Sequence, residues 1–200
     1  RSFTPSEFEK FIRNLENEPQ PDVRLIGLLS AYCGAPSGEL AKLKRRDVKL
    51  NSETPYLVFR AITGKDRIAR SVPLIGTVRT EIETHVNVYC NEPNDPIFSS
   101  KLTKSSSDVS KRLKAHIVNQ RPHDPLELVP YSLRHTFSDR AYSAGMSGDL
   151  VQYLLGHKTK GSSKIHARYG TGLPPSHLVE GMTAAQKVTK WGIFEEYDSE

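Results

Sequence analysis

The spacing of apolar residues changes along this chain from a helical period to a strand period and back, and this change constrains the fold most. Strand-like alternation is confined to 48–50, 56–59 and 68–74, with a turn at Thr63–Asp66. Apolar residues recur at helical spacing elsewhere, which predicts helices over 5–17, 22–32, 39–45, 78–89, 105–118, 131–144, 147–155 and 176–188. We therefore predict an α+β fold that is mainly helical, with a small antiparallel sheet at one edge.

Start and stop signals support several of these helices. Thr4 and Glu7 have the spacing of a capping box, and Pro5 suits the first helical position. Asp22 is expected to cap the second helix. Gly145 and Gly156 follow apolar helical segments, as glycines at helix C-termini do.

Composition indicates one domain over residues 1–190, followed by an acidic tail over 191–200. The net charge of +5 is compatible with a polyanionic partner. Cys33 and Cys90 lie far apart and outside any metal-ligand spacing, which predicts free thiols in a reducing, cytoplasmic compartment. The longest apolar run is too short to cross a membrane, so no membrane association is expected. Zinc-protease, serine-hydrolase and nucleotide-binding fingerprints are missing from the sequence.

Four local patterns carry a more specific signal. In chain order they are GELAKLKRRDV, TGKDRIARSVPL, YSLRHTFSDRAYSAGM and LLGHKTKGSSKIHARYG. Together they resemble the catalytic domain of the tyrosine recombinases, the phage integrase family, from about residue 5 to 185. The resemblance implies that family's catalytic architecture. It also implies that the N-terminal core-binding domain of such proteins is absent from this sequence.

The resemblance implies a chemistry in which a tyrosine attacks a DNA phosphodiester, leaving a 3′-phosphotyrosine and a free 5′-hydroxyl. Tyr169 matches the nucleophile, and Arg134 matches an arginine that clamps the phosphate. His157 matches the histidine after LLG that binds the scissile phosphate, and Lys65 matches the hairpin lysine that protonates the leaving oxygen. Tyr131 stands at the position of the first histidine in the family's HxxR triplet. No metal or other cofactor is implied.

One position departs from the pattern in a way that affects chemistry. Pro36 stands where the family places its first catalytic arginine, and proline offers neither a charge nor a donor. Losing one preorganised donor to a phosphoryl group costs roughly a hundredfold to a thousandfold in rate. Candidate replacement cations elsewhere in the chain are Arg24, Arg45, Arg46 and Arg70.

The predicted function is site-specific recombination or integration of DNA for a phage or other mobile element, impaired at Pro36. A non-catalytic DNA-binding descendant of an integrase is the alternative. Double-stranded DNA is the expected partner. We expect a homo-tetramer on DNA, and a monomer is compatible with the chain in the absence of DNA. Candidate DNA-binding residues are the basic ones near the motifs: Lys42, Lys44, Arg45, Arg67, Lys111, Arg112, Lys158, Lys160 and Lys164.

Overall fold

Helix α2, Pro21–Cys33, is the central element of the fold in the computed structural model. The structure describes residues 1–61, 68–99, 106–118, 127–158 and 172–191. Most residues of α2 are buried, because α1 (Pro5–Glu16), α4 (Gly76–Tyr89), α6 (Ser106–Lys114) and α7 (Ser132–Ser143) all pack against it. A leucine buried in this way stabilises the fold by roughly 1.5–3 kcal/mol. The continuous apolar run of α2 is therefore the centre of the core.

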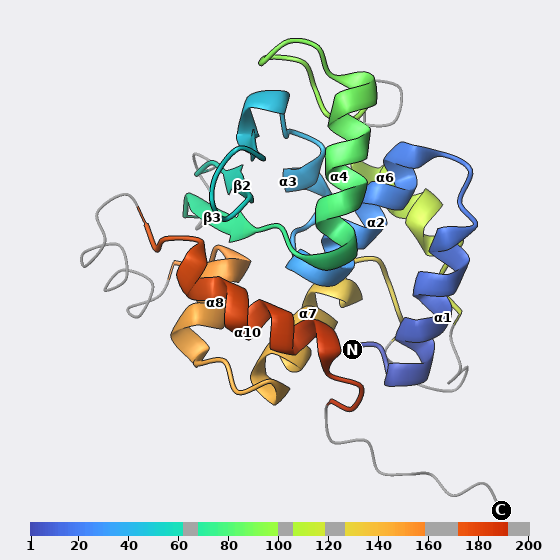
Figure 1. The fold of residues 1–200 in the computed structure, drawn as a ribbon. Coiled ribbons are helices and arrows are strands. Elements are labelled where there is room, and N and C mark those ends of the chain that lie inside the picture. The colour runs from blue at the N-terminus through green and yellow to red at the C-terminus, as the bar shows by residue number, and fades with distance from the viewer. Residues whose placement is uncertain (62–67, 100–105, 119–126, 159–171, 192–200) are drawn as a thin grey trace, which may run out of the picture.

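The C-terminal part forms a second group of helices below α2 in the view of Figure 1. Here α7 packs against both α8, Gly148–Leu155, and α10, Ser176–Lys187. Helices α8 and α10 both contact strand β3, Arg70–Pro73. The sheet and the C-terminal helices therefore share a boundary.

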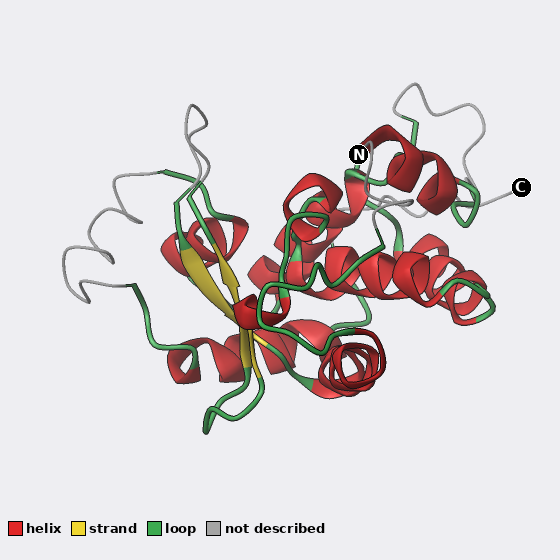
Figure 2. Ribbon diagram, turned by 90° about the horizontal axis from the view of Figure 1, so that it is seen from above, coloured by secondary structure: helices red, strands yellow, loops and turns green. Residues whose placement is uncertain are grey.

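The three strands form one antiparallel sheet in the order β1-β2-β3, and the strands lie in the left half of the view in Figure 2. Strand β1, Val48–Lys49, pairs with β2, Tyr56–Phe59, and β2 pairs in turn with β3. This confirms the predicted mainly helical fold with a small antiparallel sheet.

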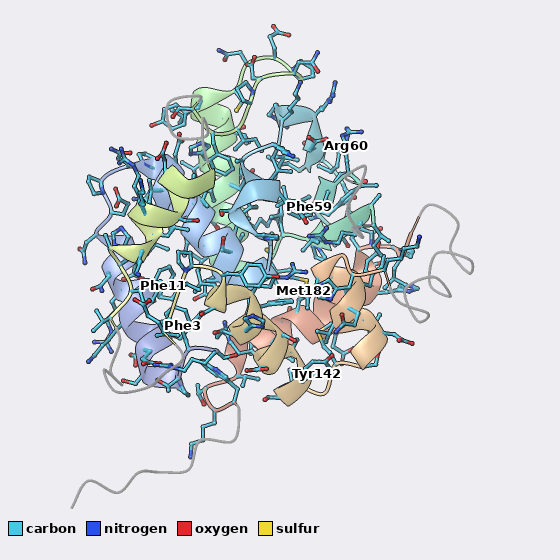
Figure 3. The ribbon with its side chains drawn as sticks, turned by 180° about the vertical axis from the view of Figure 1, so that it is seen from behind. Phe3, Phe11, Phe59, Arg60, Tyr142 and Met182 are labelled. Carbon is cyan, nitrogen blue, oxygen red and sulfur yellow. The ribbon has the colours of Figure 1, made fainter. Side chains whose placement is uncertain are left out.

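The first helix forms as its signals predict. The hydroxyl of Thr4 accepts from the backbone N–H of Glu7, and the Glu7 carboxylate accepts from the N–H of Thr4, which completes the capping box. Its apolar face is buried, and the rings of Phe3 and Phe11 pack 5.7 Å apart at the positions labelled in Figure 3. Helix α1 is thus encoded by local sequence and held by α2.

The predicted helix over 39–45 is wrong in its extent. Helix α3 spans only Ser37–Leu40, and a separate 3₁₀ turn, η1, covers Arg45–Asp47. The chain turns between them because main-chain groups of residues 43–46 bind the loop over 93–97. The backbone N–H groups of Arg45 and Arg46 donate to Asp95 and Pro93, and Leu43 accepts from Ile97. Contacts distant in sequence thus override the local helical pattern.

Asp22 does not cap α2, contrary to expectation. Gln20 occupies the N-cap position and Pro21 begins the helix, so Asp22 lies in the first turn. One carboxylate oxygen of Asp22 accepts from the N–H of Ser99 at 2.8 Å, and the other lies 3.3 Å from Nε2 of His85. Asp22 therefore attaches α2 to α4 and to the chain that follows α4.

A buried guanidinium joins the two ends of the described chain. Arg140 of α7 lies over the rings of Phe8, Tyr32 and Trp191 at 4.6, 5.4 and 5.3 Å, and it donates to the carbonyl of Gln186. Burial lowers the pKa of Arg140.

None of the described helices combines the length and the apolar character needed to cross a lipid bilayer.

Candidate active site

Two helices end at glycines that bring their last turns to α7 and β3. Gly34 ends α2 and Gly156 ends α8, both in the left-handed conformation, with φ of 63° and 73°. A Cβ atom on Gly34 would lie 2.5 Å from the Phe137 ring, and one on Gly156 would lie 2.4 Å from Nη1 of Arg70. Only glycine fits both the φ angle and the space. The carbonyl groups at both helix ends therefore lie close to cationic side chains of α7 and β3.

Arg134, the third residue of α7, binds both helix ends. Its Nη1 donates to the carbonyl of Gly34 at 2.8 Å, and its Nη2 donates to the carbonyl of Leu155. The residue is only 3% exposed. Helix C-termini carry partial negative charge and unpaired carbonyls, so a buried guanidinium is well placed there.

His157 is brought directly to Arg134. Nη2 of Arg134 lies 2.9 Å from Nε2 of His157, and Nδ1 of His157 lies 2.5 Å from Oε1 of Gln152. The two residues that the sequence singles out from separate motifs, YSLRHTF and LLGH, thus touch. The half-buried imidazole lies between a cation and a neutral amide.

A second buried arginine binds the same helix end from the sheet side. Nε of Arg70 donates to the carbonyl of Leu154 at 2.7 Å, and Nη2 lies 2.6 Å from the carboxylate of Glu39. Both side chains of this ion pair are nearly inaccessible to solvent. Removing one partner of such a pair costs about 3–5 kcal/mol. Arg70 therefore fastens α8 to β3 and α3, with its charge balanced by Glu39.

Two residues next to segments outside the described ranges also bind the end of α8. The N–H of Ile68, which follows segment 62–67, donates to the carbonyl of Gly156 at 3.1 Å. The N–H of Leu173, just beyond segment 159–171, donates to the hydroxyl of Tyr153 at 3.2 Å. The predicted residues Lys65 and Tyr169 lie within these segments, outside the described residues, as do Arg67, Lys160 and Lys164.

Pro36 lies close to this cluster along the chain. It is the half-buried N-cap of α3, two residues beyond Gly34, whose carbonyl binds Arg134. Its φ of −69° and ψ of 143° suit any residue type. The backbone at position 36 could therefore carry an arginine without strain.

The four arginines considered as replacements are all engaged elsewhere. Arg24 lies 3.2 Å from Glu81 on α4, Arg45 donates to the carbonyl of Val48, and Arg46 donates to the side chain of Asn94. Arg70 is nearest to the cluster, but it is 3% exposed and paired with Glu39. None of the four presents an unpaired guanidinium at Arg134 within the described part of the chain.

Tyr131 and Tyr153, both among the described residues, occupy distinct environments. Tyr131 is 47% exposed just before α7 and packs edge-on against His135. Tyr153 is completely buried, and burial raises the pKa of its hydroxyl, which accepts from the N–H groups of Ser71 and Leu173. Its hydroxyl cannot reach a DNA backbone without unfolding α8.

Basic candidates gather on neighbouring elements. Helix α6, with exposed Lys111 and Arg112, packs against α3, and exposed Lys42 lies two residues after α3. Lys44 and Arg45 are half-buried at the start of η1, and exposed Lys158 follows His157. Among the described candidates, the exposed side chains are thus those of Lys42, Lys111, Arg112 and Lys158, and Lys158 adjoins His157 in the chain.

The sequence patterns do not predict the roles of Gln152, Glu39 and Gly34 in the cluster. A signal exists for Gln152, because it lies five residues before a histidine that follows a glycine helix stop. Across the described ranges, no three His, Cys, Asp or Glu side chains are grouped in a way that could hold a metal ion.

Comparison with known proteins supports one family. A model of the phage integrase family matches residues 1–169. Tyrosine recombinase XerA of Pyrococcus horikoshii is 28% identical over 94% of this chain and 62% of its own length. Tyrosine recombinase XerC of Bradyrhizobium diazoefficiens is 30% identical over 82% of this chain and 49% of its own length.

Solved structures share the fold at lower identity. A XerA recombinase crystal structure has a TM-score of 0.64 and 22% identity, covering 92% of this chain and 64% of that one. The lambda integrase catalytic core has a TM-score of 0.57 and 22% identity, covering 79% of this chain and 96% of that one.

These matches define the class as a tyrosine recombinase catalytic fold. The chain belongs to the phage integrase family. It spans 49% to 62% of the two curated relatives described above.

Proposed function

We propose that this chain is the catalytic part of a site-specific DNA recombinase that breaks and rejoins DNA through a 3′-phosphotyrosine at Tyr169. The observation that carries the proposal is the 2.9 Å contact between Arg134 and His157 at the end of α8. The segments that contain Lys65 and Tyr169 adjoin residues bonded to the same helix end.

The proposed chemistry needs no metal. The hydroxyl of Tyr169 gives its proton to Nε2 of His157 and its oxygen attacks phosphorus, the bond from phosphorus to the 5′-oxygen breaks, and Lys65 gives that oxygen a proton. Arg134, and His157 once its Nε2 carries that proton, stabilise the charge that develops on the phosphate oxygens. Rejoining is the reverse reaction by a 5′-hydroxyl.

Double-stranded DNA is the proposed partner, and the Tn1549 transposon integrase, a structural neighbour, was solved in complex with transposon right end DNA. Lys42, Lys111, Arg112 and Lys158 would contact phosphates, because their cationic side chains are exposed. Assembly as a tetramer on DNA, origin in a phage or mobile element and a cytoplasmic location are further parts of the proposal.

Covalent adduct formation tests the proposal directly. The chain is incubated with a pool of nicked duplexes of randomised core sequence, and protein–DNA adducts are isolated under denaturing conditions. We expect an adduct with the unaltered chain that is lost in Tyr169→Phe. An adduct that persists in Tyr169→Phe would refute the assignment of the nucleophile.

Pro36 favours a second candidate function, a DNA-binding protein without cleavage. Restoring the donor with Pro36→Arg is expected to raise adduct formation roughly a hundredfold to a thousandfold. If neither the unaltered chain nor the Pro36→Arg variant forms an adduct, while both bind duplex DNA in a salt-dependent manner, the non-catalytic function is correct.

A further inference from the structure

We infer that Gln152 is a positioning residue that holds His157 with its proton on Nδ1, so that Nε2 is the nitrogen presented beside Arg134. Its relevance to DNA chemistry rests on the proposed function, in which Arg134 and His157 meet one phosphate.

The donor and acceptor roles follow from the chemistry of arginine. A guanidinium only donates hydrogen bonds, so Nε2 of His157, 2.9 Å from Nη2 of Arg134, must accept. A neutral imidazole with an accepting Nε2 carries its proton on Nδ1. That Nδ1–H points at Oε1 of Gln152, 2.5 Å away, and the carbonyl end of the amide accepts it.

The orientation of the Gln152 amide follows from the same donor and acceptor roles. If its NH₂ group faced His157, two donors would oppose each other, because Nδ1 is already protonated. With the oxygen toward His157, the amide nitrogen faces the hydroxyl of Tyr142 at 3.4 Å. The chain of groups Arg134, His157, Gln152 and Tyr142 is then consistent in every donor and acceptor.

The backbone places Gln152 beside His157. At the end of α8 the N–H of His157 donates to the carbonyl of Gln152 at 3.0 Å, and the N–H of Gly156 donates to the carbonyl of Tyr153. This is the Schellman arrangement, in which the third residue from the helix end meets the second residue beyond it. The side chains of Gln152 and His157 occupy those two positions, so their contact follows from the left-handed Gly156.

The consequence is that the ring keeps one orientation. Rotating the ring to present Nδ1 to Arg134 would break both side-chain bonds of His157. A group bound at Arg134 would therefore meet Nε2, the nitrogen that can take up a proton and then donate to a phosphate, and not Nδ1. Gln152 achieves this without touching the phosphate itself.

The test measures the protonated nitrogen of His157 by two-bond ¹H–¹⁵N NMR spectra of the ¹⁵N-labelled chain without DNA. The His157 signals are assigned by their loss in His157→Gln. We expect Nδ1 to be protonated and Nε2 unprotonated. A protonated Nε2 in the unaltered chain would overturn the inference.

Variants separate the amide oxygen from other properties of Gln152. Gln152→Met keeps the length and the helix preference but removes the acceptor, and we expect mixed tautomers. Gln152→Glu retains an acceptor oxygen and should keep Nδ1 protonated, and Tyr142→Phe should leave the tautomer unchanged. A single Nδ1–H tautomer in Gln152→Met, or its loss in Gln152→Glu, would contradict the assignment.

The adduct assay distinguishes this inference from the proposed function. The tautomer is read without DNA, so a correct tautomer together with a missing adduct would refute cleavage alone. If cleavage occurs, Gln152→Met is expected to reduce adduct formation, and Gln152→Glu to restore it in part.

Discussion

Arg134 donates a hydrogen bond to His157 across 2.9 Å, and the same guanidinium binds the carbonyls of Gly34 and Leu155. One side chain from α7 therefore holds together the ends of α2 and α8. Arg134, which the sequence suggests as a phosphate ligand, is therefore also a structural connector. Its replacement should have two effects, one on stability and one on activity.

Replacing Arg134 by lysine should lower stability as well as activity. Lysine lacks the planar fork, so the carbonyls of Gly34 and Leu155 cannot both be satisfied in the same geometry. We expect the free energy of unfolding to fall by about 2–4 kcal/mol, measured by urea denaturation. His157→Ala removes only one acceptor and should cost less. An equal loss in both variants would contradict the connector role.

Gly156→Ala should destabilise the chain more than Gly145→Ala. Both glycines have positive φ, of 73° and 83°, but only a Cβ at 156 would meet Arg70, at 2.4 Å, whereas nothing lies within 4 Å of one at 145. The control therefore incurs only the cost of the left-handed conformation, roughly 1–2 kcal/mol. Thermal and urea unfolding of the two variants measure the difference. Equal destabilisation would show that Arg70 moves aside freely.

Stability should fall at alkaline pH because of Cys33. Burial raises the pKa of this thiol from 9.0 to about 12, so the unfolded chain releases the proton first as the pH rises. The free energy of unfolding should be insensitive to this group below pH 9, then fall by up to about 1.4 kcal/mol per pH unit toward pH 12.

Urea denaturation at several pH values, in the unaltered chain and in Cys33→Ala, measures this dependence. In the variant, the free energy of unfolding should decline less steeply above pH 9, because the Cys33 thiol is gone. Some decline should remain, because burial also raises the pKa values of Tyr32 and Tyr153. Parallel declines in the two proteins would assign the loss to other groups.

If the chain binds duplex DNA through α6, removing its exposed cations should reduce the salt dependence. Lys111→Ala and Arg112→Ala each remove one cation that would bind a phosphate, so each should lower the slope of log K against log salt by about 0.9. Lys187→Ala on α10 is the matched control, because α10 packs against α7 and β3. Dissociation constants at several salt concentrations provide the slopes. Equal changes in slope for all three variants would argue against an interface on α6.

Local sequence determined the elements whose signals are local. The capping box of Thr4 and Glu7, the helical period of α1 and the strands of the hairpin all formed near their predicted positions. The four motifs also identified the family. The free, buried state of Cys33 and Cys90 agrees with their apolar surroundings in the sequence.

Only the tertiary structure decided what depends on two distant segments meeting. Helix α3 is short because the loop over 93–97 binds residues 43–46, and Asp22 bonds Ser99 instead of capping its helix. No pattern within one segment could show that Arg134 reaches the ends of α2 and α8, or that Arg70 is neutralised by Glu39. A hydrogen bond between side chains depends on three-dimensional distance, and long-range packing sets that distance here.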